Sequence, residues 1–119
     1  MKKVNKYYLK KIRELNCSAC GQEGFYGVQA HHNTNRTGLG GKAPDIESMP
    51  LCHGCHHSLH FGIGIKKWEN KFNNQDDLVV KARLRLFYNI KNSNYPKKEM
   101  EKINFTEEEI DDFIKNNSF

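Results

Sequence analysis

The sequence predicts an α+β protein in which a short core of two strands and one helix is flanked by α-helices. Three observations support this fold class. All four cysteines and all six histidines lie between residues 17 and 60. Apolar residues recur with helical periodicity before and after that segment, whereas the apolar runs inside it are short and strand-like. Only 37% of the 119 residues are hydrophobic, so we expect a bound ion to supplement a thin core.

The first half of the chain is predicted to contain one helix and two strands. Residues 5–15 form a basic amphipathic helix, because their apolar side chains fall on one side. A strand is expected over residues 25–32, which are rich in aromatic and β-branched character, and a second over residues 47–51, where Pro50 limits its length. The glycine-rich residues 33–44 connect the two strands as a loop.

The second half is predicted to be helical. A helix over residues 53–60 places two histidines, four positions apart, on one face. A short helix follows over residues 66–72, and a longer one begins with Asp76 as its N-cap and runs to about residue 90. Thr106 and Glu109 predict a capping box at the start of the last helix.

The cysteines are spaced as two Cys-x-x-Cys pairs. Two residues between thiolates allow one tight turn to present both sulfurs to a tetrahedral ion, and two such turns complete a closed site. We expect structural Zn²⁺ rather than disulfides, because no secretory signal is visible at the start of the sequence. The lack of a strand-helix-strand pattern argues against a redox motif. The predicted zinc ligands are Cys17, Cys20, Cys52 and Cys55.

The histidines predict a second metal site with open coordination positions. Adjacent residues at a strand end point to opposite sides, so His31 can bind an ion while His32 faces another part of the same site. His56 and His60, at i and i+4 of a helix, can bind the same ion. Water or a phosphate oxygen can occupy the remaining positions. His32 is then free to act as a general base, since an ordinary imidazole pKa of about 6.5 suits proton abstraction near neutral pH.

The net charge of +5 is unevenly distributed. Residues 1–16 carry six basic side chains against one acidic, and residues 61–98 carry nine against three. Residues 99–119 reverse the sign, with two basic side chains against seven acidic. Basic segments on both sides of the Cys/His segment favour nucleic acid lying across it. No stretch approaches the ~18 apolar residues of a membrane span.

The order of these motifs resembles a nuclease superfamily. AHH at residues 30–32, a loop, and PLCHGCHHSLH at residues 50–60 are similar to the ββα-metal fold of HNH endonucleases with a zinc-stabilised, treble-clef-like frame. The chain most resembles the phage recombination nucleases of the RecA-dependent Ref type. The shared features are an HH pair, a GGxK-like loop at residues 40–42, an Asp before a PLCxxCH segment, and an aromatic-Glu pair at residues 68–69. The resemblance covers roughly residues 15–75.

The resemblance implies a metal-dependent DNA endonuclease. In that family the first residue of the strand-end pair binds the catalytic metal and the second is the general base, and these positions match His31 and His32. The helix supplies further ligands, here matching His56 and His60. The implied cofactors are structural Zn²⁺ and a catalytic divalent ion. Three imidazoles favour Zn²⁺, Ni²⁺ or Mn²⁺, while relatives of this kind commonly work with Mg²⁺.

The chain departs from the family pattern in two places. The Asn that names the HNH motif is absent from its expected place, and Asp45 or Glu47 occupies that region. We assign Asp45 to the catalytic group together with His32. The basic arm ahead of the first cysteine is also short.

Four basic residues are predicted to contact the DNA backbone. The glycine-rich loop is not a Walker A motif, because Ala43 stands where Ser or Thr would bind Mg²⁺. A basic loop beside the metal site would instead clamp phosphates, and the short helix after the histidines would add further contacts. The predicted contacts are Arg36, Lys42, Lys66 and Lys67.

We therefore expect one nuclease domain over residues 1–119, divided into a basic N-terminal helix (1–16), a zinc and ββα-metal core (17–75) and C-terminal helices (76–119). The expected location is the cytoplasm, and the expected partner is DNA, with a recombinase-coated filament implied by the Ref resemblance. The expected role is recombination or processing of phage or mobile-element DNA. Two alternatives remain, a non-catalytic zinc module that binds nucleic acid and a zinc-dependent protein-interaction domain.

Overall fold

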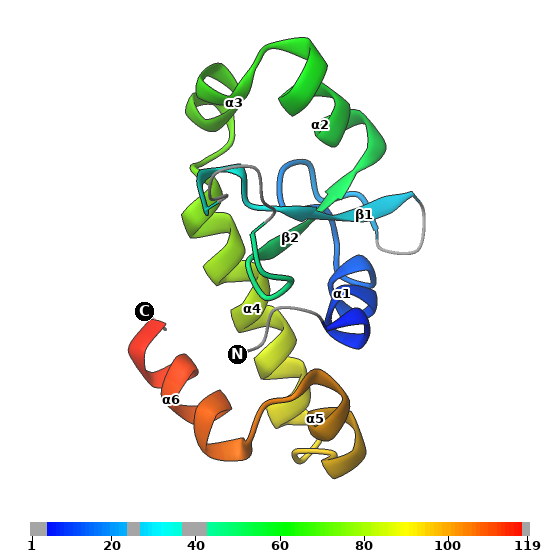
Figure 1. Cartoon of the computed structure of the whole chain (residues 1–119), viewed down its shortest axis with the longest axis vertical. Coiled ribbons are helices and arrows are strands. Elements are labelled where there is room, and N and C mark those ends of the chain that lie inside the picture. Colours follow the sequence, from blue (N-terminus) through cyan, green and yellow to red (C-terminus); the bar gives the residue numbers. More distant parts are fainter. Residues whose placement is uncertain (1–4, 24–26, 37–42, 118–119) are drawn as a thin grey trace.

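The computed structural model describes residues 5–23, 27–36 and 43–117. Within these ranges the chain forms a first helix, then a two-stranded sheet, and then a succession of helices (Figure 1). In chain order the elements are α1 (Lys6–Arg13), β1 (Val28–His32), the 3₁₀ turn η1 (Thr34–Arg36), β2 (Ser48–Cys52), α2 (His53–His57), the π-helical turn η2 (Ser58–Gly62), α3 (Ile65–Lys71), α4 (Gln75–Asn92), α5 (Lys97–Ile103) and α6 (Glu107–Asn117).

The two strands are antiparallel, and their register separates the cysteines from the paired histidines. Val28 lies opposite Cys52 at one end of the ladder, and His32 lies opposite Ser48 at the other. Helix α2 begins immediately after Cys52 and contacts both strands, which places its histidines close to the end of β1. This β1–β2–α2 arrangement is a ββα unit, and it confirms the predicted α+β class.

Helix α4 is the longest element and runs along the long axis of the molecule (Figure 1). The ββα unit lies toward one end of α4, and α5 and α6 lie toward the other. The predicted apolar stripe of α4 is buried, and Phe87 from the same helix packs its ring 5.0 Å from Phe105 and 5.3 Å from Phe113. The buried stripe consists of Val79, Ala82, Leu86 and Ile90.

The predicted helix over residues 53–60 is only partly right. Helix α2 ends at His57, and the backbone widens into η2, in which the Ile63 N–H donates to the Ser58 carbonyl at 3.0 Å. This turn buries Leu59 completely. It is closed by Gly62, where a Cβ atom would lie 3.3 Å from Ser58 Oγ.

The predicted start of α4 is wrong by two residues. Asn74, not Asp76, is the N-cap, because Asn74 Oδ1 accepts the Asp77 N–H at 2.8 Å. Asp76 instead accepts a bond from Asn33 Nδ2 at 2.6 Å. The prediction also missed α5, a short helix that follows Pro96.

The other boundaries agree closely with the prediction. Strand β1 is described from Val28, and β2 is shifted by one residue relative to the expected range. The capping box of α6 is confirmed, since Thr106 N donates to Glu109 Oε1 at 2.9 Å and Glu109 N donates to Thr106 Oγ1 at 3.1 Å. Among the described residues, no helix combines the length and apolar character needed to cross a bilayer.

Candidate metal and catalytic site

The four predicted zinc ligands meet at the end of the sheet where Cys52 lies opposite Val28. Their Sγ atoms all lie within 4.8 Å of one another. Cys17 and Cys20 come from the turn after α1, Cys52 ends β2, and Cys55 lies in the first turn of α2. The set therefore joins the turn after α1 to the junction between β2 and α2.

Local backbone contacts hold the turn that contains Cys17 and Cys20 in a conformation that brings their sulfurs together. The Gly21 N–H donates to the Cys17 carbonyl at 3.0 Å, and Gly21 adopts φ of 81°, which favours glycine. The Ser18 N–H donates to the Pro50 carbonyl at 2.8 Å, which attaches the turn to β2. Both Cys-x-x-Cys pairs direct an N–H toward the first sulfur, from Cys20 to Cys17 and from Cys55 to Cys52, each at 3.5 Å.

The thiols differ in acidity. Burial opposes ionisation of Cys17, yet N–H donors from Cys20, Cys52 and Ala19 lower its pKa to about 7. Burial and the neighbouring Cys52 thiol raise the pKa of Cys55. Four sulfurs this close cannot all become thiolates without a compensating cation. A closed set of four cysteines is the typical donor set of structural Zn²⁺, and the residues present fit that ion.

The three predicted imidazole ligands also meet. Donor atoms of His31 on β1, His56 on α2 and His60 on η2 lie within 4.8 Å of one another. Their ring centroids are 4.9 to 5.2 Å apart in edge-on pairs. We call these three residues the histidine triad. His31 is 3% exposed and His60 lies at the surface, so the triad is open on one side.

Two glutamines determine which nitrogen atoms face the centre of the triad. His31 Nε2 lies 2.8 Å from Gln75 Oε1, which also accepts the Thr34 N–H at 3.1 Å. His31 Nε2 therefore carries the proton. His56 Nδ1 lies 2.7 Å from Gln29 Oε1 and is the donor there. The lone pairs of the two histidines are left on His31 Nδ1 and His56 Nε2.

These two lone-pair nitrogens face each other at 3.2 Å with no proton assigned between them. A proton placed between the two nitrogens would relieve their repulsion, but burial disfavours it. Burial lowers the pKa of His31 to about 4 and also lowers the pKa of His56. A divalent cation would satisfy both lone pairs together with His60. Outer hydrogen bonds from metal-ligating histidines to oxygen acceptors are the usual way such ligands are oriented. The triad therefore fits a metal ion through neutral imidazoles.

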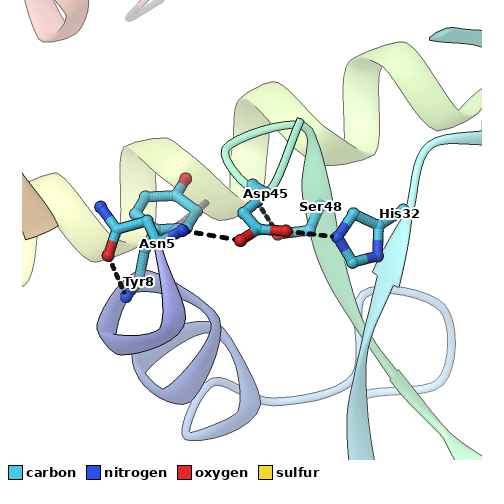
Figure 2. Close-up of polar contacts among 5 residues, drawn as sticks. All are labelled: Asn5, Tyr8, His32, Asp45 and Ser48. Atoms are coloured by element: carbon cyan, nitrogen blue, oxygen red, sulfur yellow. Dashed lines mark hydrogen bonds and ion pairs between the residues drawn. The ribbon is translucent and has the colours of Figure 1, made fainter. Parts of the chain in front are cut away.

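His32 follows His31 in β1 and is paired with Asp45, as Figure 2 shows. His32 Nε2 is 2.8 Å from Asp45 Oδ1. The other carboxylate oxygen, Oδ2, accepts the Asn5 N–H at 2.7 Å, and Ser48 Oγ donates to the Asp45 carbonyl at 2.6 Å. These contacts orient Asp45 toward His32. Because Nε2–H donates to the carboxylate, the lone pair of His32 is on Nδ1.

The turn after His32 depends on Asn33, a residue that the sequence reasoning missed. Asn33 is fully buried, and its N–H donates to the Glu47 carbonyl at 2.8 Å. Its side-chain Oδ1 accepts the Asn35 N–H at 2.9 Å. The reasoning also missed Gln29 and Gln75. Nothing in the spacing of Gln75 pointed to it, since it lies 44 residues from His31.

The predicted DNA contacts are only partly described. Lys66 and Lys67 are exposed in the first turn of α3. Arg36 ends η1, and its side chain and the whole of Lys42 lie outside the described residues.

Two arginines of α4 make hydrogen bonds within the protein. Arg83 donates to the Ile46 carbonyl and to Tyr8 Oη. Arg85 donates to Ser18 Oγ at 3.2 Å and to the Asn16 carbonyl at 3.4 Å. Both link α4 to earlier parts of the chain.

Together, the ββα unit, the histidine triad and the four-cysteine group define a small α+β protein that has two groups of residues able to hold a metal ion and is consistent with an HNH-like fold. Residues 1–86 match the family described as protein of unknown function (DUF968). The chain therefore belongs to the DUF968 family. No curated protein matches the chain, and no solved structure matches it.

Proposed function

We propose that this protein is a metal-dependent DNA endonuclease of the HNH class, with structural Zn²⁺ at the four cysteines. The observation that carries the proposal is the pair of lone-pair nitrogens, His31 Nδ1 and His56 Nε2, which face each other at 3.2 Å beside the His32–Asp45 pair. A cation site open on one side and an oriented imidazole base are the two parts that phosphodiester hydrolysis needs.

In the proposed reaction, His32 Nδ1 takes a proton from the attacking water. The water oxygen forms a bond to phosphorus, and the bond from phosphorus to the 3′ oxygen breaks. Asp45 stabilises the imidazolium that forms and keeps the proton on Nε2 in the resting state. A divalent ion at the triad would polarise the phosphate and stabilise the departing oxygen. Three imidazoles favour Zn²⁺, Ni²⁺ or Mn²⁺, and Mg²⁺ remains a candidate from the HNH resemblance.

DNA is the proposed partner because the chain is basic around the site. Lys66 and Lys67 are exposed on the helix that follows the triad, and Arg36 and Lys42 precede β2 in the sequence. Phosphate contacts of this kind position a strand without reading its sequence. The likeness to Ref-type nucleases supports a role in phage or mobile-element recombination, with a recombinase-coated filament as a further proposed partner. Four free thiols fit a reducing compartment such as the cytoplasm.

Plasmid nicking tests this proposal. Wild type, His32→Ala and His53→Ala are compared in Mg²⁺, Mn²⁺, Ni²⁺ and Zn²⁺. His53 is an exposed histidine of α2 outside the triad, which makes it a matched control. We expect His32→Ala to lose about 100-fold or more in rate, and His53→Ala to cut as wild type does.

Two outcomes would change the assignment. Equal cutting by His32→Ala and wild type would show that His32 is not the base. Salt-sensitive DNA binding by wild type without cutting in any metal would favour the non-catalytic nucleic-acid module.

A further inference from the structure

An exposed apolar segment begins directly after the last histidine of the triad. Four large apolar side chains are prominently exposed among the described residues, and three of them fall between Phe61 and Ile65. Phe61 is 79% exposed, Ile63 42% and Ile65 39%. A phenylalanine this exposed loses the stabilisation that burial of its ring would provide, so such a patch points to a binding surface.

The backbone of η2 directs this segment outward. Leu59 is completely buried, whereas Phe61, two positions later, projects into solvent. Gly64, with φ of 85°, then turns the chain into α3. Turns of the π type occur frequently at functional sites, where an extra residue re-aims side chains.

Phe61 lies within one nucleotide's reach of the triad. Its ring centroid is 6.1 Å from that of His60 and 5.4 Å from that of His57. A strand whose phosphate lies over the triad would therefore carry a neighbouring base to the Phe61 ring. Successive nucleotides of one strand are spaced at about 3.4 Å in a duplex and further apart when the strand is extended, so these dimensions are compatible.

The charges around Phe61 favour a polyanion over an apolar partner. From Phe61 to Trp68 the sequence contains Lys66 and Lys67 and no carboxylate. Glu69, the next acidic residue, accepts the Gln75 N–H at 2.7 Å and a bond from Asn35 Nδ2 at 2.9 Å. An aromatic ring next to lysines is the usual composition of a surface that binds unpaired nucleic acid.

We propose that Phe61 is a stacking site for an unpaired nucleobase of the DNA strand whose phosphate lies at the histidine triad. The exposed side chains of Ile63 and Ile65 would add apolar contacts to the stacked base. This inference rests on the proposed nuclease function and adds a substrate class to it. The preferred substrate is single-stranded or locally unpaired DNA, because a base inside an intact duplex cannot present its face to the ring.

The test measures DNA binding independently of cutting. In a His32→Ala background, fluorescence anisotropy compares a labelled 12-nucleotide oligo-dT strand with the same strand in a duplex. Phe61→Ala is expected to weaken single-strand binding about 10-fold while changing duplex binding less than about 2-fold. Phe61→Trp should restore single-strand affinity, and Phe61→Leu should not, because leucine keeps the apolar bulk without an aromatic face.

Tyr88→Ala is the control. Tyr88 is another exposed aromatic, 39% exposed, but it lies on α4 beside Cys17 and Ser18. Single-strand binding by Tyr88→Ala should equal that of the background protein. Equal loss in Tyr88→Ala and Phe61→Ala would overturn the proposal.

Other results separate this inference from the proposed function. If wild type cuts DNA but Phe61→Ala binds single strands unchanged, the stacking site is wrong and the nuclease remains. If wild type cuts no DNA but Phe61→Ala still loses single-strand affinity, the result supports the stacking site and contradicts the proposed nuclease activity. Restoration of binding by Phe61→Leu, or a loss of self-association on Phe61→Ala without change in DNA affinity, would overturn the stacking site.

Discussion

At the scale of single residues, the contact between His32 and Asp45 determines which nitrogen of His32 carries the proton in the resting state, and so which nitrogen would act as the base in the proposed reaction. The carboxylate accepts from Nε2 and leaves Nδ1 as the basic atom. Asp45 is itself oriented by the Asn5 N–H at the start of α1. In the proposed reaction, Asp45 would therefore act through His32 as a positioning residue.

Asp45→Asn tests this role. The Asn5 N–H keeps the amide oxygen of the new side chain on its own side, so the amide NH₂ faces His32 Nε2. Nε2 must then accept, which favours the tautomer with the proton on Nδ1. A protonated Nδ1 cannot take a proton from water. We expect the nicking rate to fall about 10²- to 10⁴-fold, as in other carboxylate–histidine pairs, with the fold retained. Glu47→Gln is the matched control, because the contact of the Glu47 carboxylate with Arg83 is a distant one, at 4.0 Å, and the backbone bonds of Glu47 are kept. An Asp45→Asn protein with wild-type activity would remove Asp45 from the mechanism.

The two glutamines of the triad predict different effects on metal affinity. Gln75 is fully buried, so Gln75→Met leaves the buried His31 Nε2–H without an acceptor. We expect the affinity for Ni²⁺ or Mn²⁺ to fall about 10- to 100-fold in titration calorimetry. Gln29 is exposed, and water can replace it at His56 after Gln29→Met, so a smaller effect is expected. Equal affinities for Gln75→Met and wild type would contradict the assignment of Gln75.

At the scale of elements, the start of α4 connects helix capping to the triad. Asn74 caps the helix, and the first helical residue, Gln75, orients His31. An N-cap side chain compensates an N–H group that has no partner within the helix. The cap is therefore part of the structure that positions His31 in the triad.

Asn74→Ala is expected to lower the free energy of unfolding by about 1 kcal/mol, since it removes the acceptor for the Asp77 N–H. Chemical denaturation of the zinc-loaded protein measures this change. Asn74→Asp keeps an acceptor at the same place and should recover most of the stability. A fully stable Asn74→Ala protein would mean that the cap is not needed.

At the scale of the whole molecule, the cysteine group joins the turn after α1, the end of β2 and the start of α2. The core alone is thin, and binding of structural Zn²⁺ contributes on the order of 10–16 kcal/mol in small zinc domains. Trp68 is fully buried, and its Nε1–H donates to the Cys55 carbonyl at 3.1 Å. Its fluorescence should therefore report the integrity of this region.

Removal of zinc by a strong chelator is expected to unfold the protein. The loss should appear as a red shift of Trp68 emission and a fall in helical circular dichroism. His31→Ala, which disables the triad but not the cysteines, is the control and should keep the Trp68 emission of the wild type. A chelated protein with an unchanged spectrum would show that the cysteine group is not structural.

Spacing along the chain was sufficient to predict much of the molecule. The two Cys-x-x-Cys pairs, the His56 and His60 spacing and the capping box at Thr106 are local patterns, and each appears in the structure where it was expected. Such patterns are readable because backbone geometry alone sets which neighbours share a turn or a face. The resulting α+β class follows from them.

Other features were decided only by tertiary structure. Gln75 contacts His31 from 44 residues away in the sequence, and Asp45 contacts His32 from 13 residues away. In the π-helical turn η2, Leu59 is buried and Phe61 is exposed. Local sequence periodicity cannot predict these contacts, because they depend on how α4, β1 and η2 pack together. The sequence by itself determined which residues are able to bind metal. Packing decided which nitrogen of His31 and which nitrogen of His56 face the centre of the triad, since that choice depends on partners distant in the chain.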